Sequence, residues 1–178
     1  RPIYGVGAPG TGCGSRTATS LSQRAELYLA AVRAMQPTGP YMFGGWSFGG
    51  VLAYEMARQV LEAGEQVGLL ALIDSYTPTL LAEIEGYDGV APDILELFAR
   101  EVAGAGGTGL LRRSDGVAIA DVDDLYGVPE LAAALQGIDN VQLSDRFACF
   151  RSNMLMARAY EPVACSVAAN LYIAEQGH

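Results

Sequence analysis

The chain has 178 residues, of which 51% are hydrophobic and 17% charged, a composition typical of one folded domain and unlike that of a disordered chain. All eleven Lys and Arg residues are arginine. The net charge is −9, which argues against nucleic acid as a partner because phosphates attract basic surfaces. No apolar run reaches the roughly 18 residues of a membrane span, and no signal peptide is recognisable. We therefore expect a cytoplasmic protein with no membrane partner.

Short apolar runs and helical periodicity alternate along the first half of the chain. Apolar runs at residues 3–6, 41–43 and 67–73 predict strands. Apolar residues at helical spacing predict one helix after the N-cap Ser20 and another at about 48–63. The second helix has an expected polar face of Glu55, Arg58, Gln59 and Glu62. This order predicts an α/β fold, with a mainly parallel sheet and helices on both faces.

The pattern changes from Pro78 onward, where helical segments follow one another without a convincing strand between them. Helices are expected at 92–102, 129–135 and 144–160, and a strand-like run returns at 167–174. Residues 79–150 hold thirteen acidic residues against four arginines, so the whole net charge of −9 lies in this stretch. We divide the chain into an α/β core (1–77), a helical insertion with a return helix (78–160), and a core strand with a following loop (161–178).

The feature that points most directly to chemistry is a Gly-x-Ser-x-Gly motif centred on Ser47. The motif directly follows a predicted strand and opens a predicted helix, which is the context of a nucleophile elbow. In that turn the serine hydroxyl stands above the sheet, and the backbone N–H of Phe48 can point at an oxyanion. The alternative is a glycine-rich turn with an incidental serine.

Two further residues complete a possible catalytic triad. Asp74 ends the strand at 67–73, one helix and one strand after Ser47, so we expect it at the neighbouring strand end. His178 is the only histidine and is the base if the chain contains a Ser-His-Asp triad. The order Ser, Asp, His along the chain is that of α/β-hydrolases. The alternatives are that Asp74 forms a turn and that His178 is a frayed terminal residue.

Other chemistries have weaker support. The motif Gly5-x-Gly7-x-x-Gly10 matches a dinucleotide fingerprint, but no predicted helix follows it directly. The absence of lysine excludes a phosphate loop of the Gly-Lys-Ser/Thr type. The cysteines Cys13, Cys149 and Cys165 are widely spaced and odd in number, so neither structural zinc nor a disulfide framework is expected. We expect no bound cofactor and no metal.

Four segments between residues 20 and 78 form a recognisable set, namely Gln36-Pro37 with Gly39-Pro40, Gly45-Trp46-Ser47-Phe48-Gly49-Gly50, Ala53-Tyr54-Glu55 and Leu72-Ile73-Asp74-Ser75. With these segments, residues 20–78 resemble the thioesterase domain that closes modular polyketide and nonribosomal peptide synthases, a branch of the α/β-hydrolase superfamily. Weaker similarity continues at Phe150-Arg151-x-Asn153 and at Ala159-Tyr160.

The resemblance implies an α/β-hydrolase fold in which the acidic insertion is a lid over the active site. It implies Ser47 as nucleophile, Asp74 as orienting acid, His178 as base and the Phe48 N–H as one oxyanion donor. The substrate would be an acyl or peptidyl chain on the phosphopantetheine arm of a carrier protein, released by hydrolysis or macrocyclisation. The family also has a strand and a loop that would precede residue 1 and supply the other oxyanion donor.

Three alternatives remain open at the level of function. The chain could be a stand-alone editing thioesterase, another serine esterase of the same fold, or a non-catalytic α/β-hydrolase-like module. A homodimer is also compatible with the sequence.

Overall fold

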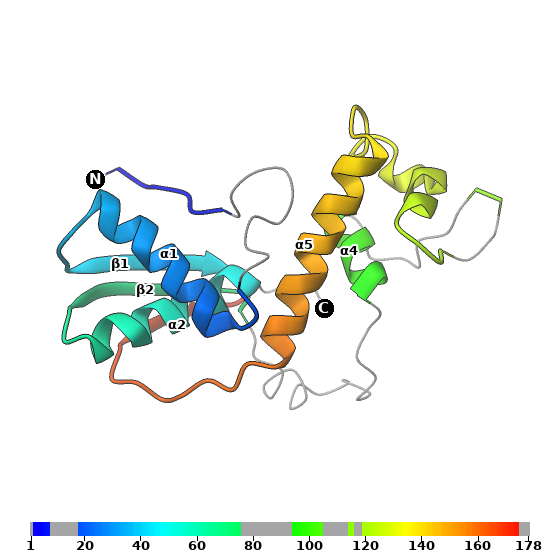
Figure 1. The fold of residues 1–178 in the computed structure, drawn as a ribbon. Helices are drawn as coiled ribbons and strands as arrows, with labels where there is room; N and C mark the ends of the chain where they lie inside the picture. The colour runs from blue at the N-terminus through cyan, green and yellow to red at the C-terminus, as the bar shows by residue number, and fades with distance from the viewer. Residues whose placement is uncertain (1, 8–17, 76–93, 105–113, 116–118, 175–178) are drawn as a thin grey trace. The chain divides into compact units, whose positions relative to one another are not determined.

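The computed structural model describes residues 2–7, 18–75, 94–104, 114–115 and 119–174 (Figure 1). These residues belong to two compact units, each with its own hydrophobic core. The first unit contains residues 2–7, 18–75 and 155–174, and the second contains 94–104, 114–115 and 119–154. Within the described ranges, no helix is both long enough and apolar enough to cross a membrane.

The first unit is built on a parallel sheet whose described strands are β1 (Tyr41–Trp46), β2 (Val67–Ile73) and β3 (Ala169–Tyr172), in the order β1-β2-β3. Trp46 pairs with Ile73, and Ile73 pairs with Tyr172. The last residues of the three strands therefore meet at one edge of the sheet. The predicted parallel α/β sheet is confirmed.

Two helices of the first unit follow the predicted signals closely. Helix α1 (Leu21–Met35) begins after Ser20, whose hydroxyl accepts a hydrogen bond from the Gln23 N–H at 3.2 Å. Helix α2 (Phe48–Glu62) packs on β1 and β2, and α1 packs on α2. Burial of an apolar helix face against a sheet is the main source of stability in such a unit.

The core of the first unit lies on one face of its sheet. Along β1, Tyr41 and Phe43 point into the core, whereas Met42 is exposed, as the two-residue period of a strand requires. Met42 pairs with Leu69 of β2, which is also exposed. Helices on the second face stay a prediction.

The predicted strand at residues 3–6 is not formed. These residues have no regular structure, and Ile3 is 97% and Tyr4 66% exposed. A short apolar run becomes a strand only when a neighbouring strand accepts and donates its backbone hydrogen bonds. No strand among the described residues pairs with this segment, so apolar composition alone was misleading here.

The second unit is helical and has a separate core. It contains α4 (Ile94–Ala103), the 3₁₀ helices η2 (Asp123–Gly127) and η3 (Pro129–Leu131), and most of α5 (Asn140–Arg158). Phe98 of α4 packs against Phe147 and Phe150 of α5, with ring centroids 5.3 and 5.5 Å apart. The other buried members of this core are Leu95, Ala99, Leu125, Val128, Leu131, Leu135 and Leu143.

Two helix predictions in the second unit need correction. Residues 129–135 form a short 3₁₀ helix followed by turns instead of an α-helix, because a segment of this length rarely repays the cost of helix nucleation. Helix α5 begins four residues before the predicted position 144. Its start is a capping pair in which the Asp139 carboxylate accepts from the Gln142 N–H at 2.8 Å and the Gln142 side chain accepts from the Asp139 N–H.

Candidate active site

Ser47 occupies a sharp turn between β1 and α2, as the Gly-x-Ser-x-Gly motif predicts. Its φ angle is +52°, a strained value for a residue other than glycine, and it is exposed. Its N–H donates to the Ile73 carbonyl at 2.8 Å, and its own carbonyl accepts from the Gly50 N–H at 3.0 Å. The turn is therefore held from both sides by backbone hydrogen bonds, which maintain the strained serine.

The glycines around Ser47 are required by close contacts between backbone segments. A Cβ atom on Gly45 would overlap the carbonyl of Gly49, and a Cβ atom on Gly50 would overlap the side chain of Ser75. The strand and the helix can approach each other this closely only because both positions lack side chains. Glycine at positions 45 and 50 is therefore required for the turn at Ser47 to form.

Asp74 directly follows β2 and also has a left-handed backbone, with φ +44°. Its half-buried carboxylate accepts a hydrogen bond from the Ala174 N–H at 2.7 Å, and its own N–H donates to the Tyr172 carbonyl at 2.9 Å. Ser47 and Asp74 follow the paired residues Trp46 and Ile73. They therefore stand at neighbouring strand ends, as expected from the sequence.

Ser75 is a neighbour of this site that sequence reasoning missed. It is 9% exposed, and its hydroxyl donates to the Ile73 carbonyl at 2.9 Å. The hydroxyl lies where a side chain on Gly50 would have to go. A serine after an aspartate gives no sequence signal of this kind, because the contact depends on the approach of α2 to the end of β2.

Phe48 and His178 are the other two predicted site residues. Phe48 is the first residue of α2, and the N–H groups in the first turn of a helix lack intrahelical acceptors and carry the positive end of the helix dipole. That position suits an oxyanion donor, a role that stays a prediction. His178 lies outside the described residues, so its predicted role as base also stays a prediction.

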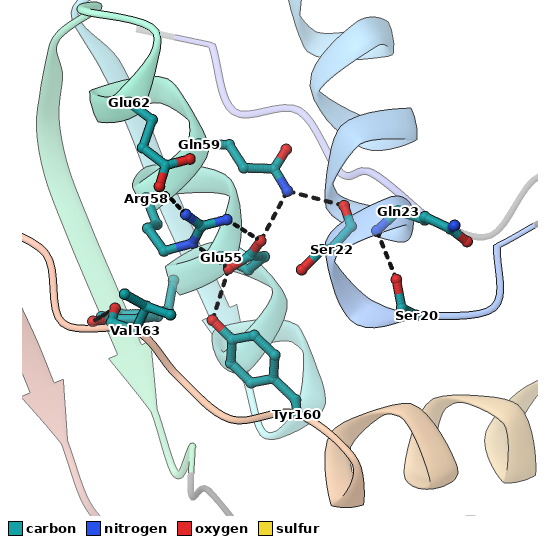
Figure 2. Close-up of polar contacts among 10 residues, drawn as sticks. Ser20, Ser22, Gln23, Glu55, Arg58, Gln59, Glu62, Tyr160 and Val163 are labelled. Carbon is teal, nitrogen blue, oxygen red and sulfur yellow. Dashed lines mark hydrogen bonds and ion pairs between the residues drawn. The ribbon is translucent and has the colours of Figure 1, made fainter.

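Behind the turn at Ser47, the expected polar face of α2 carries a buried charge. Glu55 belongs to that face and yet is only 1% exposed. Figure 2 shows its carboxylate held by Arg58, Gln59 and Tyr160. One sequence signal indicated these contacts. Arg58 and Gln59 lie three and four residues after Glu55, and side chains at that spacing meet on one helix face.

The electrostatics of Glu55 follow from these contacts. Burial alone would raise its pKa, but the hydrogen bonds from Arg58, Gln59 and Tyr160 outweigh burial and lower the pKa from 4.5 to about 2. The pKa of Tyr160 is raised by burial and by its hydrogen bond to the carboxylate. The carboxylate is thus ionised, and the Tyr160 hydroxyl keeps its proton, at neutral pH.

A parallel sheet, a strained serine between a strand and a helix, and an aspartate at the next strand end together define an α/β-hydrolase fold. Residues 1–107 match the family model described as thioesterase domain. The match covers more than half of the chain, and the chain belongs to this family.

Known proteins similar to this chain include large synthases and their domains. Non-reducing polyketide synthase PKS16 of Cladonia grayi is 51% identical over 80 residues, which are 45% of this chain and 4% of the synthase. The thioesterase domain of NocB, solved as a covalent complex with a fluorophosphonate nocardicin G analogue, is 27% identical with a TM-score of 0.60, over 92% of this chain and 56% of that one. The four-domain nonribosomal peptide synthetase AB3403 is 28% identical with a TM-score of 0.64, over 88% of this chain and 12% of that one. This chain thus spans a small part of the synthases it matches.

Proposed function

We propose that this chain is a thioesterase that releases an acyl or peptidyl chain from a phosphopantetheine carrier through an acyl-enzyme on Ser47. The observation that carries the proposal is the strained, exposed serine at the head of α2, beside the strand end that bears Asp74. Strain of this kind costs energy that a turn without a catalytic role has no reason to retain. Membership of the thioesterase domain family and similarity to synthases supply the class of substrate.

In the first step, the Ser47 hydroxyl oxygen attacks the thioester carbonyl carbon while its proton passes to the His178 imidazole. The oxyanion of the tetrahedral intermediate accepts a hydrogen bond from the Phe48 N–H. Collapse of the intermediate breaks the carbon–sulfur bond, and the phosphopantetheine thiol leaves with the proton from His178. Asp74 orients the imidazole and stabilises its positive charge.

In the second step, a nucleophile attacks the carbonyl carbon of the Ser47 ester and gives its proton to His178. The bond between that carbon and the Ser47 oxygen then breaks, His178 returns the proton to the serine oxygen, and the product leaves. Water gives a free acid, whereas a hydroxyl or amine of the bound chain gives a macrocycle. By family resemblance, residues 78–160 comprise a lid insertion, which shapes the acyl site, and a return helix. The separate hydrophobic core of the second unit supports treating this region as a module of its own.

Turnover of a matched pair of substrates tests this proposal. The wild-type protein and Ser47→Ala are compared on an acyl-pantetheine thioester and on the corresponding simple oxygen ester. We expect thioester hydrolysis that is lost in Ser47→Ala. Faster turnover of the simple ester would favour a general esterase, and absence of turnover with either substrate would favour a non-catalytic module. Hydrolysis of a thioester on a separate carrier protein, but not on a carrier fused to this chain, would favour a stand-alone editing enzyme.

A further inference from the structure

The Glu55 carboxylate accepts hydrogen bonds on both oxygens. One oxygen accepts from Arg58 Nε at 2.7 Å and from the Tyr160 hydroxyl at 2.8 Å. The other accepts from Arg58 Nη2 at 2.7 Å and from Gln59 Nε2 at 2.9 Å. An ionised carboxylate has about four acceptor sites, so these four bonds satisfy the buried charge. A buried charge is costly unless it is satisfied in this way.

Tyr160 differs from the other donors because it comes from a distant part of the chain. Arg58 and Gln59 lie on α2 itself, whereas Tyr160 is 105 residues away from Glu55 in the sequence. Gln59 also donates to the Ser22 carbonyl of α1 at 2.9 Å. The carboxylate therefore connects three segments of the first unit, namely α1, α2 and the chain that follows α5 (Figure 2).

The segment 161–168 links Tyr160 to β3 and has no regular structure. A second tyrosine, Tyr54 on α2, also contacts this segment. Its hydroxyl donates to the Val163 carbonyl at 2.9 Å. We call residues 160–168 the return segment. Two hydroxyl contacts thus attach the return segment to the helix that begins at the nucleophile.

The strand that follows the return segment has no buried side chain to fix its register. β3 has four residues, all exposed, and among the described strands it pairs only with β2. A slip of one residue would move Ala174 by about 3.3 Å. That shift would break its hydrogen bond to the Asp74 carboxylate.

We propose that Tyr160 is a positioning residue, whose hydrogen bond to Glu55 fixes the register of β3 and so the contact between Ala174 and Asp74. This inference rests on the proposed function for its catalytic consequence, because Asp74 is the proposed triad acid. Its structural part concerns the register of β3 alone. Tyr160 acts through this alignment and does not touch the substrate.

The test removes the hydroxyl with Tyr160→Phe in the full chain and uses Tyr126→Phe as the matched control. Tyr126 also donates one hydrogen bond through its hydroxyl, in the second unit, to the Ile138 carbonyl at 2.9 Å. Amide hydrogen exchange is followed by mass spectrometry in peptides covering 169–174 and in peptides of α1. We expect exchange at 169–174 to accelerate about tenfold in Tyr160→Phe, with α1 unchanged, and no change there in the control.

Kinetics supply the second readout. On a pantetheine thioester, Tyr160→Phe should lower kcat about tenfold with little change in KM, because misalignment affects the chemical step more than binding. Exchange at 169–174 equal to wild type, or equally accelerated in α1, would overturn the inference. If Tyr160→Phe does not fold, Tyr54→Phe removes the second attachment and should change exchange and kcat in the same direction. If wild-type protein shows no thioester turnover, the proposed function fails, and the exchange result still decides the structural claim.

Discussion

At the scale of single residues, the site combines two non-glycine positions with left-handed backbones. Ser47 and Asp74 have φ angles of +52° and +44° and directly follow paired strand residues. Each such conformation costs on the order of 1–3 kcal/mol and persists only where its surroundings impose it. The backbone hydrogen bonds from Ser47 to Ile73 and from Asp74 to Tyr172 impose it here. Strain at two adjacent strand ends therefore marks this edge of the sheet.

The strain at Ser47 has a measurable consequence for stability. Ser47→Gly should be more stable than Ser47→Ala by about 1 kcal/mol, because glycine adopts a positive φ without a steric penalty. Both variants lack the hydroxyl, so they are matched in chemistry. Urea unfolding at neutral pH measures the difference. An alanine variant as stable as the glycine variant would show that the turn is not strained.

Asp74 has a structural role beside its proposed catalytic one. Asp74→Asn keeps a side-chain oxygen to accept from the Ala174 N–H, whereas Asp74→Ala leaves that donor unpaired. Asparagine also tolerates a left-handed backbone better than alanine does. We expect the alanine variant to be less stable than the asparagine variant by about 1–2 kcal/mol.

Activity separates the two roles of Asp74. Both variants should lose most of their thioester turnover, since neither supplies the negative charge that supports a protonated histidine. The measurements are chemical denaturation and kcat for the two variants. Turnover near the wild-type rate in Asp74→Asn would remove Asp74 from the triad, and equal stability of the variants would contradict the contact to Ala174.

At the scale of elements, much of the fold could be predicted and the exceptions have physical causes. The Ser20 cap and the apolar run at 67–73 correctly predicted the start of α1 and the strand β2, because both signals are local. The segment at 3–6 failed as a strand, because pairing depends on a neighbour that periodicity does not reveal. The capping pair of Asp139 and Gln142 is the local signal for the start of α5, four residues before the predicted position.

The same distinction applies to the site. The turn at Ser47 and the strand-end position of Asp74 follow from strand and helix order along the chain. The contacts of Ala174 and Tyr160 could not be predicted, since their partners lie 100 and 105 residues away in sequence. Amphipathic patterning places Glu55 on a polar helix face but does not reveal its burial, because a fully hydrogen-bonded charge can be buried.

The buried carboxylate on α2 predicts a dependence of stability on acid pH. Its pKa is about 2 in the folded protein and 4.5 without these contacts. Its contribution is therefore present above pH 4.5 and is lost as the pH falls toward 2. The full contribution is about 3 kcal/mol for a pKa change of this size.

Urea unfolding of wild-type protein and Glu55→Gln, measured between pH 6 and pH 2, checks this prediction. The variant should be less stable at pH 6, and the difference should shrink as the pH falls. Glutamine cannot ionise and so lacks this part of the pH dependence. If the difference in unfolding free energy between the two proteins stays constant from pH 6 to pH 2, ionisation of Glu55 is not the cause of the stability lost in acid.

At the scale of the whole molecule, the described chain consists of two units with separate hydrophobic cores, and the acidic residues are concentrated in 79–150. Separate cores predict separate responses to core mutations. Phe98→Ala should destabilise the second unit by about 3–5 kcal/mol, since it removes a buried ring that packs on Phe147 and Phe150.

Hydrogen exchange of α2 and α4 measures whether that response is local. We expect faster exchange in α4 with little change in α2, and the reverse for Phe43→Ala in the core of the first unit. Equal acceleration in both helices for either variant would show that the two units unfold together. Local responses would support the proposal that the acidic region is a module inserted into the hydrolase core.

The central claim is that Ser47 is an activated nucleophile, and covalent labelling tests it most directly. Folded wild-type protein is incubated with a serine-directed fluorophosphonate, and the modified residue is located by mass spectrometry. We expect one adduct, on Ser47, which is absent from Ser47→Ala. Folded protein that carries no adduct on Ser47, or carries it equally on other serines, would show that Ser47 is not an activated nucleophile.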